Sequence, residues 1–401
     1  MDSVDPLERP HGGEPRETVA RARFDAVAPF TLGIEEELLL VDATSYRAAP
    51  AAGYALAAAG DARLARELRA AQVELVTPVC ATVAEASCEL GALRRRLADA
   101  LAGAGVLVLG VGAHPLDRDP GEVSDTLRHR SLAAEHPWAA RHVLACGLHV
   151  HVAVSGADRA LAVHDALRSY LPELLALGAN APFYGAADSG LATVRPKLNQ
   201  AWPRSGVPPA FGSWRELAEF DAWARAGGAF PDGSYRWWDL RLNERHGTIE
   251  VRVADAQTRV EDAATVAALV QSLVVELAGR HDAGERLPVH PGERIAENAW
   301  LATRDGLRGH LIDLETGVRV PAVERLGELA ERLLPVARSL GCERELHRCW
   351  RLLAEGGGAG RQRRIVEERG LGELAAALAA ETAGGARDRA GESPRAILTE
   401  L

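Results

Sequence analysis

Residues 31–41 read TLGIEEELLLV, three glutamates between apolar residues. This pattern predicts a β-strand, in which residues two apart share a face, so Glu35 and Glu37 lie on one face and Glu36 on the other. Apolar residues on both faces indicate partial burial of both, where a carboxylate is unfavourable unless it binds a partner. We therefore predict a functional role for Glu35 and Glu37 and an ion pair for Glu36. A solvated strand edge is the alternative.

A second strand is predicted at residues 146–152, CGLHVHV, which places His149 and His151 on one face. Two histidines on one strand face are uncommon, although a pair of hydrogen-bonded core histidines would give the same pattern. Several carboxylates with one imidazole favour a hard cation such as Mg²⁺ or Mn²⁺, whereas zinc prefers more nitrogen or sulfur ligands.

A third segment, residues 247–253, reads GTIEVRV and puts Glu250 and Arg252 on one face and apolar residues on the other. Carboxylates, imidazoles and arginine on one sheet face can hold a divalent cation and a phosphate, so the first hypothesis is a nucleotide-dependent enzyme. Glu74, within QVELVTP, is a weaker candidate, because a single strand glutamate is usually exposed. Three more arginines are candidates for a substrate carboxylate or phosphate: Arg195, Arg241 and Arg361.

The glycine-rich stretch at residues 356–364, GGGAGRQRR, fits either a flexible basic turn or a phosphate cradle. The sequence contains no P-loop, dinucleotide fingerprint or Gly-x-Ser-x-Gly elbow. Any bound phosphates are therefore expected to be held by metal and arginine.

Composition excludes several classes of protein. The net charge of −10 argues against a non-specific nucleic-acid binder. Five cysteines with no CxxC argue against a disulfide framework or zinc site and favour the cytoplasm, as does the lack of a signal-peptide pattern in residues 1–23. The apolar stretch at residues 263–277 contains polar residues and is expected to be a buried helix rather than a membrane span.

The order of elements predicts an α+β fold with a mixed sheet. We expect strands at residues 32–41, 72–76, 105–112, 143–154, 235–242 and 248–253, and helices at 62–69, 82–101, 161–177 and from 261 onward. Residues 180–213 are expected to form a functional loop. We predict disordered tails at residues 1–23 and 384–401 and one catalytic domain at residues 24–383, because no long linker interrupts it.

Seven short motifs occur together in one order. They are GIEEE (33–37), ELVTPVC (74–80), CGLHVH (146–151), NAPF (180–183), WDLR (238–241), GTIEVRVADAQT (247–258) and EN (297–298). With these motifs the chain resembles the carboxylate–amine ligases of the glutamate–cysteine ligase type 2 family over residues 29–382. The sequence departs from the family pattern at Ala153 and in residues 188–193, the loop expected to shape the acceptor pocket.

The resemblance implies a glutamine-synthetase-like catalytic fold with a curved, mainly antiparallel sheet and helices behind it. It implies ATP, two or three Mg²⁺ or Mn²⁺ ions, phosphorylation of the γ-carboxylate of glutamate or a similar acid, and attack of an amine, with cysteine as one option. Matching positions imply metal ligands at Glu35, Glu37, Glu74, His149 and Glu250. They also imply Arg252 beside the nucleotide phosphates and substrate-side roles for His151, Arg195 and Arg241.

Two other functions remain open at this stage. One is a phosphotransferase of the guanidino-kinase type on the same fold, and the other is a non-catalytic binding protein on a decayed ligase scaffold. The expected partners are small-molecule substrates, with no nucleic acid and no membrane. A homodimer stays open, because nothing in the sequence decides the oligomeric state.

Overall fold

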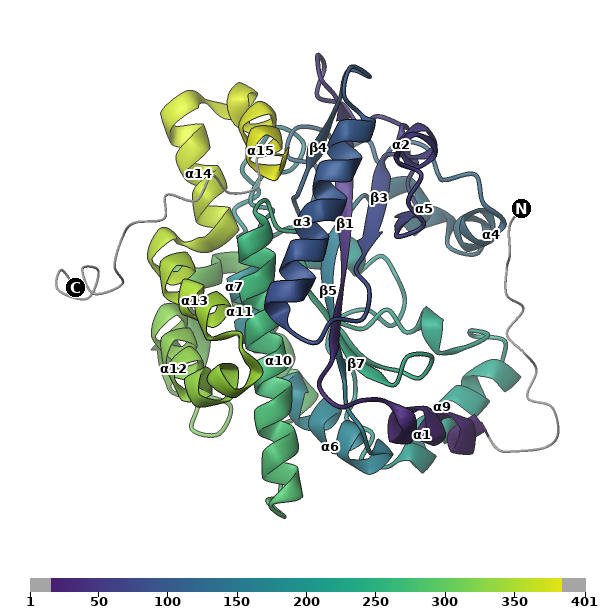
Figure 1. Cartoon of the computed structure of the whole chain (residues 1–401), viewed down its shortest axis with the longest axis vertical. Helices are drawn as coiled ribbons and strands as arrows, with labels where there is room; N and C mark the ends of the chain where they lie inside the picture. Colours follow the sequence, from purple (N-terminus) through teal and green to yellow (C-terminus); the bar gives the residue numbers. More distant parts are fainter. Residues whose placement is uncertain (1–15, 384–401) are drawn as a thin grey trace.

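A seven-stranded sheet forms the centre of the computed structural model, which describes residues 16–383 of the chain (Figure 1). The strands run in the order β2-β3-β1-β5-β7-β6, with β4 also paired to β1, and all these neighbouring strands pair antiparallel. Their bounds are β1 (Leu32–Asp42), β2 (Leu64–Arg66), β3 (Gln72–Val76), β4 (Val106–Leu109), β5 (Gly147–Ala153), β6 (Leu240–Asn243) and β7 (Thr248–Asp255). A separate hairpin pairs β8 (His310–Ile312) with β9 (Arg319–Pro321).

Helices surround this sheet on several sides. They are α1 (Arg16–Ala26), α2 (Ala52–Ala59), α3 (Val83–Ala100), α4 (Leu127–Glu135), α5 (Pro137–His142), α6 (Ala157–Leu167), α7 (Leu171–Gly178), α8 (Arg195–Asn199), α9 (Trp214–Ala226), α10 (Val260–Asp282), α11 (Gly292–Asp305), α12 (Ala322–Leu340), α13 (Glu343–Glu355), α14 (Gly357–Arg369) and α15 (Leu374–Ala383). Short 3-10 turns occur at η1 (Arg168–Tyr170), η2 (Gly233–Tyr235), η3 (Gly306–Arg308) and η4 (Leu371–Glu373).

One face of the sheet is buried under α3 and α10, which cross it in Figure 1. Ile34 and Leu38 of β1 join leucines of α3 and α10 in the main apolar core. α12 and α13 pack against α10 on the side away from the sheet, so α10 is a central helix. By length and composition α10 could cross a membrane, but 83% of its apolar stretch is buried inside the fold.

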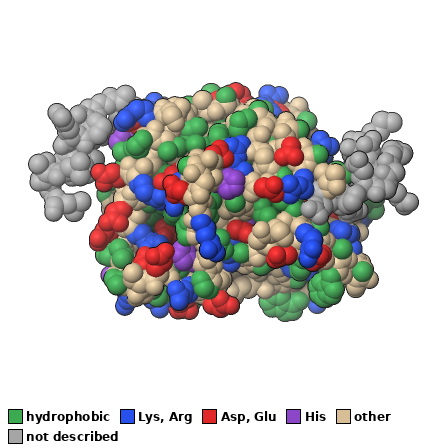
Figure 2. Space-filling model, turned by 90° about the horizontal axis from the view of Figure 1, so that it is seen from below, with side chains coloured by type: hydrophobic (Ala, Val, Ile, Leu, Met, Phe, Trp, Pro, Cys, Tyr) green, Lys and Arg blue, Asp and Glu red, His purple; other side chains and the backbone are tan. Residues whose placement is uncertain are grey.

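The opposite face of β1 is closed at one end only. There Leu39 and Val41 pack with Leu374 and Leu378 of α15 in a second core. Toward the start of β1 the same face carries the polar side chains of Glu35 and Glu37. The second core therefore ends where these charged residues begin. On the molecular face in Figure 2, acidic and basic side chains are interspersed, with no broad area of one sign.

The predicted α+β class, with a mainly antiparallel sheet and helices behind it, is confirmed. The helix predicted at residues 62–69 is wrong, because this segment pairs with β3 as β2 and the helix lies earlier, at α2. Pairing at a sheet edge has overridden local helix propensity there. The predicted helix at 161–177 is broken by η1, since Pro172 cannot supply the backbone N–H that an uninterrupted helix needs.

Several predicted boundaries also shift. Strands predicted to begin at 143 and 235 begin at Gly147 and Leu240, and the long loop at 180–213 contains α8. The predicted N-terminal tail is wrong for residues 16–23, which belong to α1, while residues 1–15 and the tail predicted at 384–401 lie outside the described residues. The limits of a single domain at 24–383 stay a prediction.

Glu36 is the buried link between the sheet and the helices. Its side chain is fully buried and accepts hydrogen bonds from Arg94 of α3 at 2.6 and 2.9 Å and from the backbone N–H of Gln257 at 3.1 Å. Arg94 also donates to the carbonyl oxygens of Gln257 and Thr258, at 2.6 and 2.9 Å. The ion pair predicted for Glu36 is confirmed, and it ties β1, α3 and the end of β7 together.

We expect Arg94→Leu to destabilise the fold strongly. The substitution leaves Glu36 buried without its cation, which typically costs about 3–5 kcal/mol. Urea unfolding, followed by circular dichroism, measures the loss. The matched control is Arg95→Leu at the neighbouring exposed position, which should change stability by no more than about 0.5 kcal/mol. Equal unfolding midpoints for the two variants would contradict the structural role of the pair.

Candidate metal and phosphoryl-transfer site

The register of five neighbouring strands gathers the predicted side chains on one face. Glu35 of β1 lies opposite His149 of β5, and Glu37 lies opposite Glu74 of β3. Farther along β5, His151 lies opposite Glu250 of β7, and Glu250 in turn lies opposite Arg241 of β6. A register shift in β5 between Leu148 and Val150 lets both histidines stay near the carboxylates.

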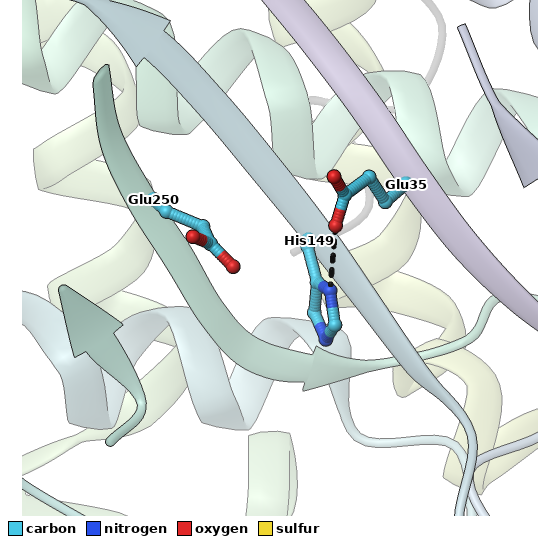
Figure 3. A group of neighbouring side chains, drawn as sticks. All are labelled: Glu35, His149 and Glu250. Carbon is cyan, nitrogen blue, oxygen red and sulfur yellow. Dashed lines mark hydrogen bonds and ion pairs between the residues drawn. The ribbon is translucent and has the colours of Figure 1, made fainter. Parts of the chain in front are cut away.

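The first group consists of Glu35, His149 and Glu250, which come from three adjacent strands and point into the same space (Figure 3). Their ligand atoms all lie within 4.8 Å of one another. Nδ1 of His149 is 3.3 Å from Oε2 of Glu35. Burial alone would raise the pKa of Glu35, but the neighbouring imidazoles of His149 and His151 hold it well below its usual range.

The second group consists of Glu37, Glu74 and the same His149, again within 4.8 Å. Nε2 of His149 is 4.0 Å from Oε1 of Glu37, so the two ring nitrogens face the two groups. Burial and the nearby Glu67 carboxylate raise the pKa of Glu37 to about 7. Burial and the same repulsion raise the pKa of Glu74 well above normal.

His149 has the protonation state that a metal ligand needs. Burial, and then the positive charge of Arg252, lower its pKa to about 4, so the imidazole is neutral at pH 7 with a nitrogen lone pair free. Gly147, two residues before His149, leaves room for two side chains, because a Cβ there would lie 2.3 Å from Nη2 of Arg195 and 3.0 Å from Nε2 of His149. Gly147 also donates its N–H to Glu37 at 2.6 Å.

The donor set fits hard divalent cations. Carboxylate oxygens predominate, a single neutral imidazole is shared, and Glu37, Glu74 and Glu67 repel one another in a way that a bound cation would relieve. Nε2 of His151 is buried without a hydrogen-bond partner, although it lies 3.3 Å from Oε1 of Glu35.

Glu250 has a second task besides any metal. Its fully buried carboxylate is paired with Arg241 at 2.6 Å and with Arg252, and it accepts a hydrogen bond from Asn243 at 2.9 Å. The two arginines are the reason that its pKa lies well below normal despite burial. Arg252 also lies 3.3 Å from Nδ1 of His149, which places its guanidinium between the two groups.

Arg195, from α8 in the long loop, holds the backbone of β7 next to the site. It donates to the backbone carbonyls of Arg252 and Val253 at 3.0 and 3.2 Å. The guanidinium therefore fixes the end of β7 and also lines the neighbouring cavity. Residues 188–193, expected to shape the acceptor pocket, do not line this cavity, and Asp188 instead pairs with Arg363 of α14.

Arg361 does not join the cluster, so its predicted place in a substrate site is corrected. It is buried on α14 and pairs with Asp262 of α10 at 2.5 Å, an ion pair that joins two helices. The glycine-rich stretch around it is neither a loose turn nor a phosphate cradle. Gly356 caps α13 in the left-handed region, and Gly358 packs where a Cβ would come within 2.4 Å of Asn180.

No sequence motif indicated the cavity that lies beside Glu37 and His149. Glu67, Trp202, Trp237 and Asp239 line it, all from segments outside the strand motifs except Asp239. The available signals were the long loop that contains Trp202 and the tryptophan pair that precedes Asp239. Neither signal shows which side chain turns inward.

Comparison with known proteins identifies close relatives. The model of glutamate–cysteine ligase family 2 matches residues 31–388. A Rubrobacter xylanophilus protein named provisionally as glutamate–cysteine ligase 2-3 is 39% identical over 355 residues, covering 87% of this chain and 95% of its own. A provisionally named glutamate–cysteine ligase 2 of Thermobifida fusca is 36% identical over 367 residues, covering 89% and 92%.

Solved structures share the fold at low identity. The crystal structure of glutamate–cysteine ligase from Francisella tularensis in complex with AMP superposes with a TM-score of 0.63 at 13% identity, covering 90% of each chain. A bifunctional glutathione synthetase from Pasteurella multocida gives a TM-score of 0.56 at 14% identity, covering 92% of this chain and 53% of its own.

We expect the protein to bind Mn²⁺ in the absence of nucleotide, and His149→Asn to weaken this binding by about tenfold or more, because His149 belongs to both groups. Electron paramagnetic resonance of free Mn²⁺ during titration measures the affinity directly. The control, His310→Asn, changes an exposed histidine far from the cluster and should bind as the wild type does. Unchanged Mn²⁺ binding in His149→Asn would rule out the shared site.

Proposed function

Because the chain belongs to glutamate–cysteine ligase family 2, we propose that it uses ATP to phosphorylate the γ-carboxylate of glutamate and joins the product to an amine. Membership makes it an ATP-dependent ligase that forms a C–N bond, with the glutamine-synthetase-like fold expected from its sequence. The observation that carries the proposal is the pair of carboxylate groups that share His149, with the Arg252 guanidinium between them.

The reaction needs charge neutralisation more than a protein nucleophile. A carboxylate is a poor electrophile, and transfer of the γ-phosphoryl group of ATP to its oxygen gives an acyl phosphate and ADP. The amine then attacks the acyl carbon, phosphate leaves, and the amine loses a proton. In the first step two anions approach each other, so clustered positive charge lowers the barrier. When bound, Mg²⁺ or Mn²⁺ would supply part of this charge.

The residues of the chain divide this work. The proposed cation ligands are the residues whose donor atoms converge: Glu35, Glu37, Glu74, His149 and Glu250. Arg252 is proposed to stabilise the transferring phosphoryl group, because Glu250 holds its guanidinium beside His149.

Arg241 and His151 flank the other end of the cluster and would face the anionic substrates. Arg241 is held on Glu250 at 2.6 Å, and His151 lies 3.9 Å from the same carboxylate. Among the described residues all five cysteines are free, with Cys88 alone exposed. Free thiols suit the reducing cytoplasm, where we propose that the enzyme works.

The products distinguish this mechanism from others. We expect turnover of ATP, glutamate and an amine to require Mg²⁺ or Mn²⁺ and to release ADP and phosphate, as measured by phosphorus NMR. Release of AMP and pyrophosphate would indicate an acyl-adenylate and refute the proposal. Formation of a phosphorylated guanidino compound in place of an amide would support the phosphotransferase instead.

We expect Arg252→Lys to fold normally and to turn over about 10²–10³ times more slowly than the wild type. Lysine keeps the positive charge beside Glu250 but loses the planar fork that contacts a phosphoryl group at two points. Steady-state ADP release and thermal melting, measured together, separate catalysis from folding.

The matched control for Arg252→Lys is Arg245→Lys, at an exposed position on the turn between β6 and β7. This variant should keep wild-type turnover. Full activity in Arg252→Lys, or a loss explained by unfolding alone, would assign Arg252 a structural role.

A further inference from the structure

The cavity beside the second carboxylate group has walls of unusual composition. It encloses about 140 Å³ next to Glu37 and His149. Apolar and aromatic residues form much of its lining: Leu68, Leu132, Val143, Ala145, Trp202 and Trp237. A cavity of about this volume has room for one small molecule of about the size of benzene. Polar side chains such as Gln72, Asn199 and Arg195 share the lining, so the space suits a small ligand that has both an apolar part and a charged group.

The two ends of the site differ in charge. Arg241 and His151 surround Glu250 at one end, whereas the carboxylates of Glu37, Glu74 and Glu67 lie at the other. ATP and glutamate are anions and fit the cationic end. An amine arrives as an ammonium ion and fits the acidic end.

Both arginines that reach the cavity already have partners. Arg252 is paired with the fully buried Glu250. Arg195 donates to two backbone carbonyls of β7. Each guanidinium therefore already has an acceptor within the protein.

Glu67, in contrast, has no cationic partner among the described residues. It lines the cavity, yet within residues 16–383 its carboxylate forms no ion pair and accepts a hydrogen bond only from the N–H of Leu68. Asp239 lies on the wall as well, with no side-chain hydrogen bond among the described residues. A ligand with a carboxylate would meet two acidic groups here, whereas a cation would give Glu67 a partner.

Aromatic rings complete this end of the cavity. The rings of Trp202 and Trp237 lie 5.5 Å apart, and His136 packs edge-on against both, at 5.8 and 5.5 Å. Indole faces attract cations and also pack well against apolar groups. The aromatic wall and the unpaired carboxylate thus favour the same kind of ligand.

We infer that the amine acceptor of this enzyme is a small cationic amine with an apolar body and no carboxylate, held by Glu67 and packed against the aromatic wall that Trp202 and Trp237 form together. The inference rests on the proposed ligase function and narrows its second substrate. It excludes cysteine and other amino acids as preferred acceptors, because their carboxylates would lie against Glu67 and Asp239.

Matched acceptor pairs test this inference on the full-length enzyme. Cysteamine differs from cysteine, and 2-phenylethylamine from phenylalanine, only by the missing carboxylate. With ATP, Mg²⁺ and glutamate, we expect kcat/KM for at least one amine to exceed that of its amino-acid counterpart by about tenfold or more, because like charges in the pocket oppose the latter. Mass spectrometry identifies each amide.

Hydroxylamine distinguishes a failure of the proposed ligase function from a failure of the inference about the acceptor. It is small and uncharged at neutral pH and traps an activated glutamate as its hydroxamate whatever the acceptor pocket prefers. Without hydroxamate the proposed ligase function itself fails. With hydroxamate, a preference for cysteine or phenylalanine, or no reaction with either amine, overturns the inference while the ligase function stands.

The variant Glu67→Gln tests whether the carboxylate of Glu67 causes the preference for amines. We expect the ratio of amine turnover to hydroxamate formation, measured in the same variant, to fall by about tenfold, because the ammonium loses its counter-charge. Using a ratio cancels any general loss of glutamate activation or of folded protein. Glu122→Gln, at an exposed position whose backbone carbonyl accepts a hydrogen bond from the N–H of Ala70, should keep the wild-type ratio. An unchanged ratio in Glu67→Gln would overturn the role of Glu67.

Discussion

The register of β1 against its neighbours is the constraint on which the whole site depends. β1 pairs with β3 on one side and with β5 on the other, so its two outward glutamates meet Glu74 and His149 at fixed positions. A shift of one residue would exchange the faces and bury both carboxylates in the apolar core. The buried ion pair of Glu36 and Arg94 opposes such a shift, because Arg94 also donates hydrogen bonds to the carbonyl oxygens of Gln257 and Thr258, just after β7. One ion pair on the core face thereby aligns strands whose other faces carry the chemistry.

The charges on the site face are arranged in two unequal halves. Around Glu250, arginines and histidine outnumber carboxylates, and this half is balanced by the protein itself. Around Glu37 and Glu74 carboxylates predominate, and the cost of that excess appears as raised pKa values. His149 lies between the halves, with one ring nitrogen toward each. A reaction that unites two anions with an amine needs such a division, because one pocket cannot attract both kinds of charge.

Strand alternation was enough to predict most of this site from the sequence. Residues two apart on a strand share a face whatever the rest of the fold does, so Glu35 with Glu37, His149 with His151, and Glu250 with Arg252 could be paired in advance. Alternation carries no information about segments without a period. Arg361 looked like a phosphate ligand within a glycine-rich stretch, yet the stretch is helical and Arg361 faces Asp262. Likewise, a helix was expected at 62–69, but residues 64–66 pair with β3 as a strand, and Glu67, which follows them, lines the cavity.

The position of Glu67 shows that the sheet fixes one part of the site, whereas loops form the other. The carboxylates and His149 stand on paired strands, where a single substitution of a neighbour can scarcely move them. Glu67, Trp202 and Trp237 stand outside the paired strands, on the connection between β2 and β3 and in the long segments that lead into and out of α9. Loops tolerate substitution without loss of the core, so the acceptor pocket can change while phosphoryl transfer stays the same. Family membership therefore predicts the activation of a carboxylate far better than it predicts the amine, and the identity of that amine has to be argued from the charges and rings of this chain.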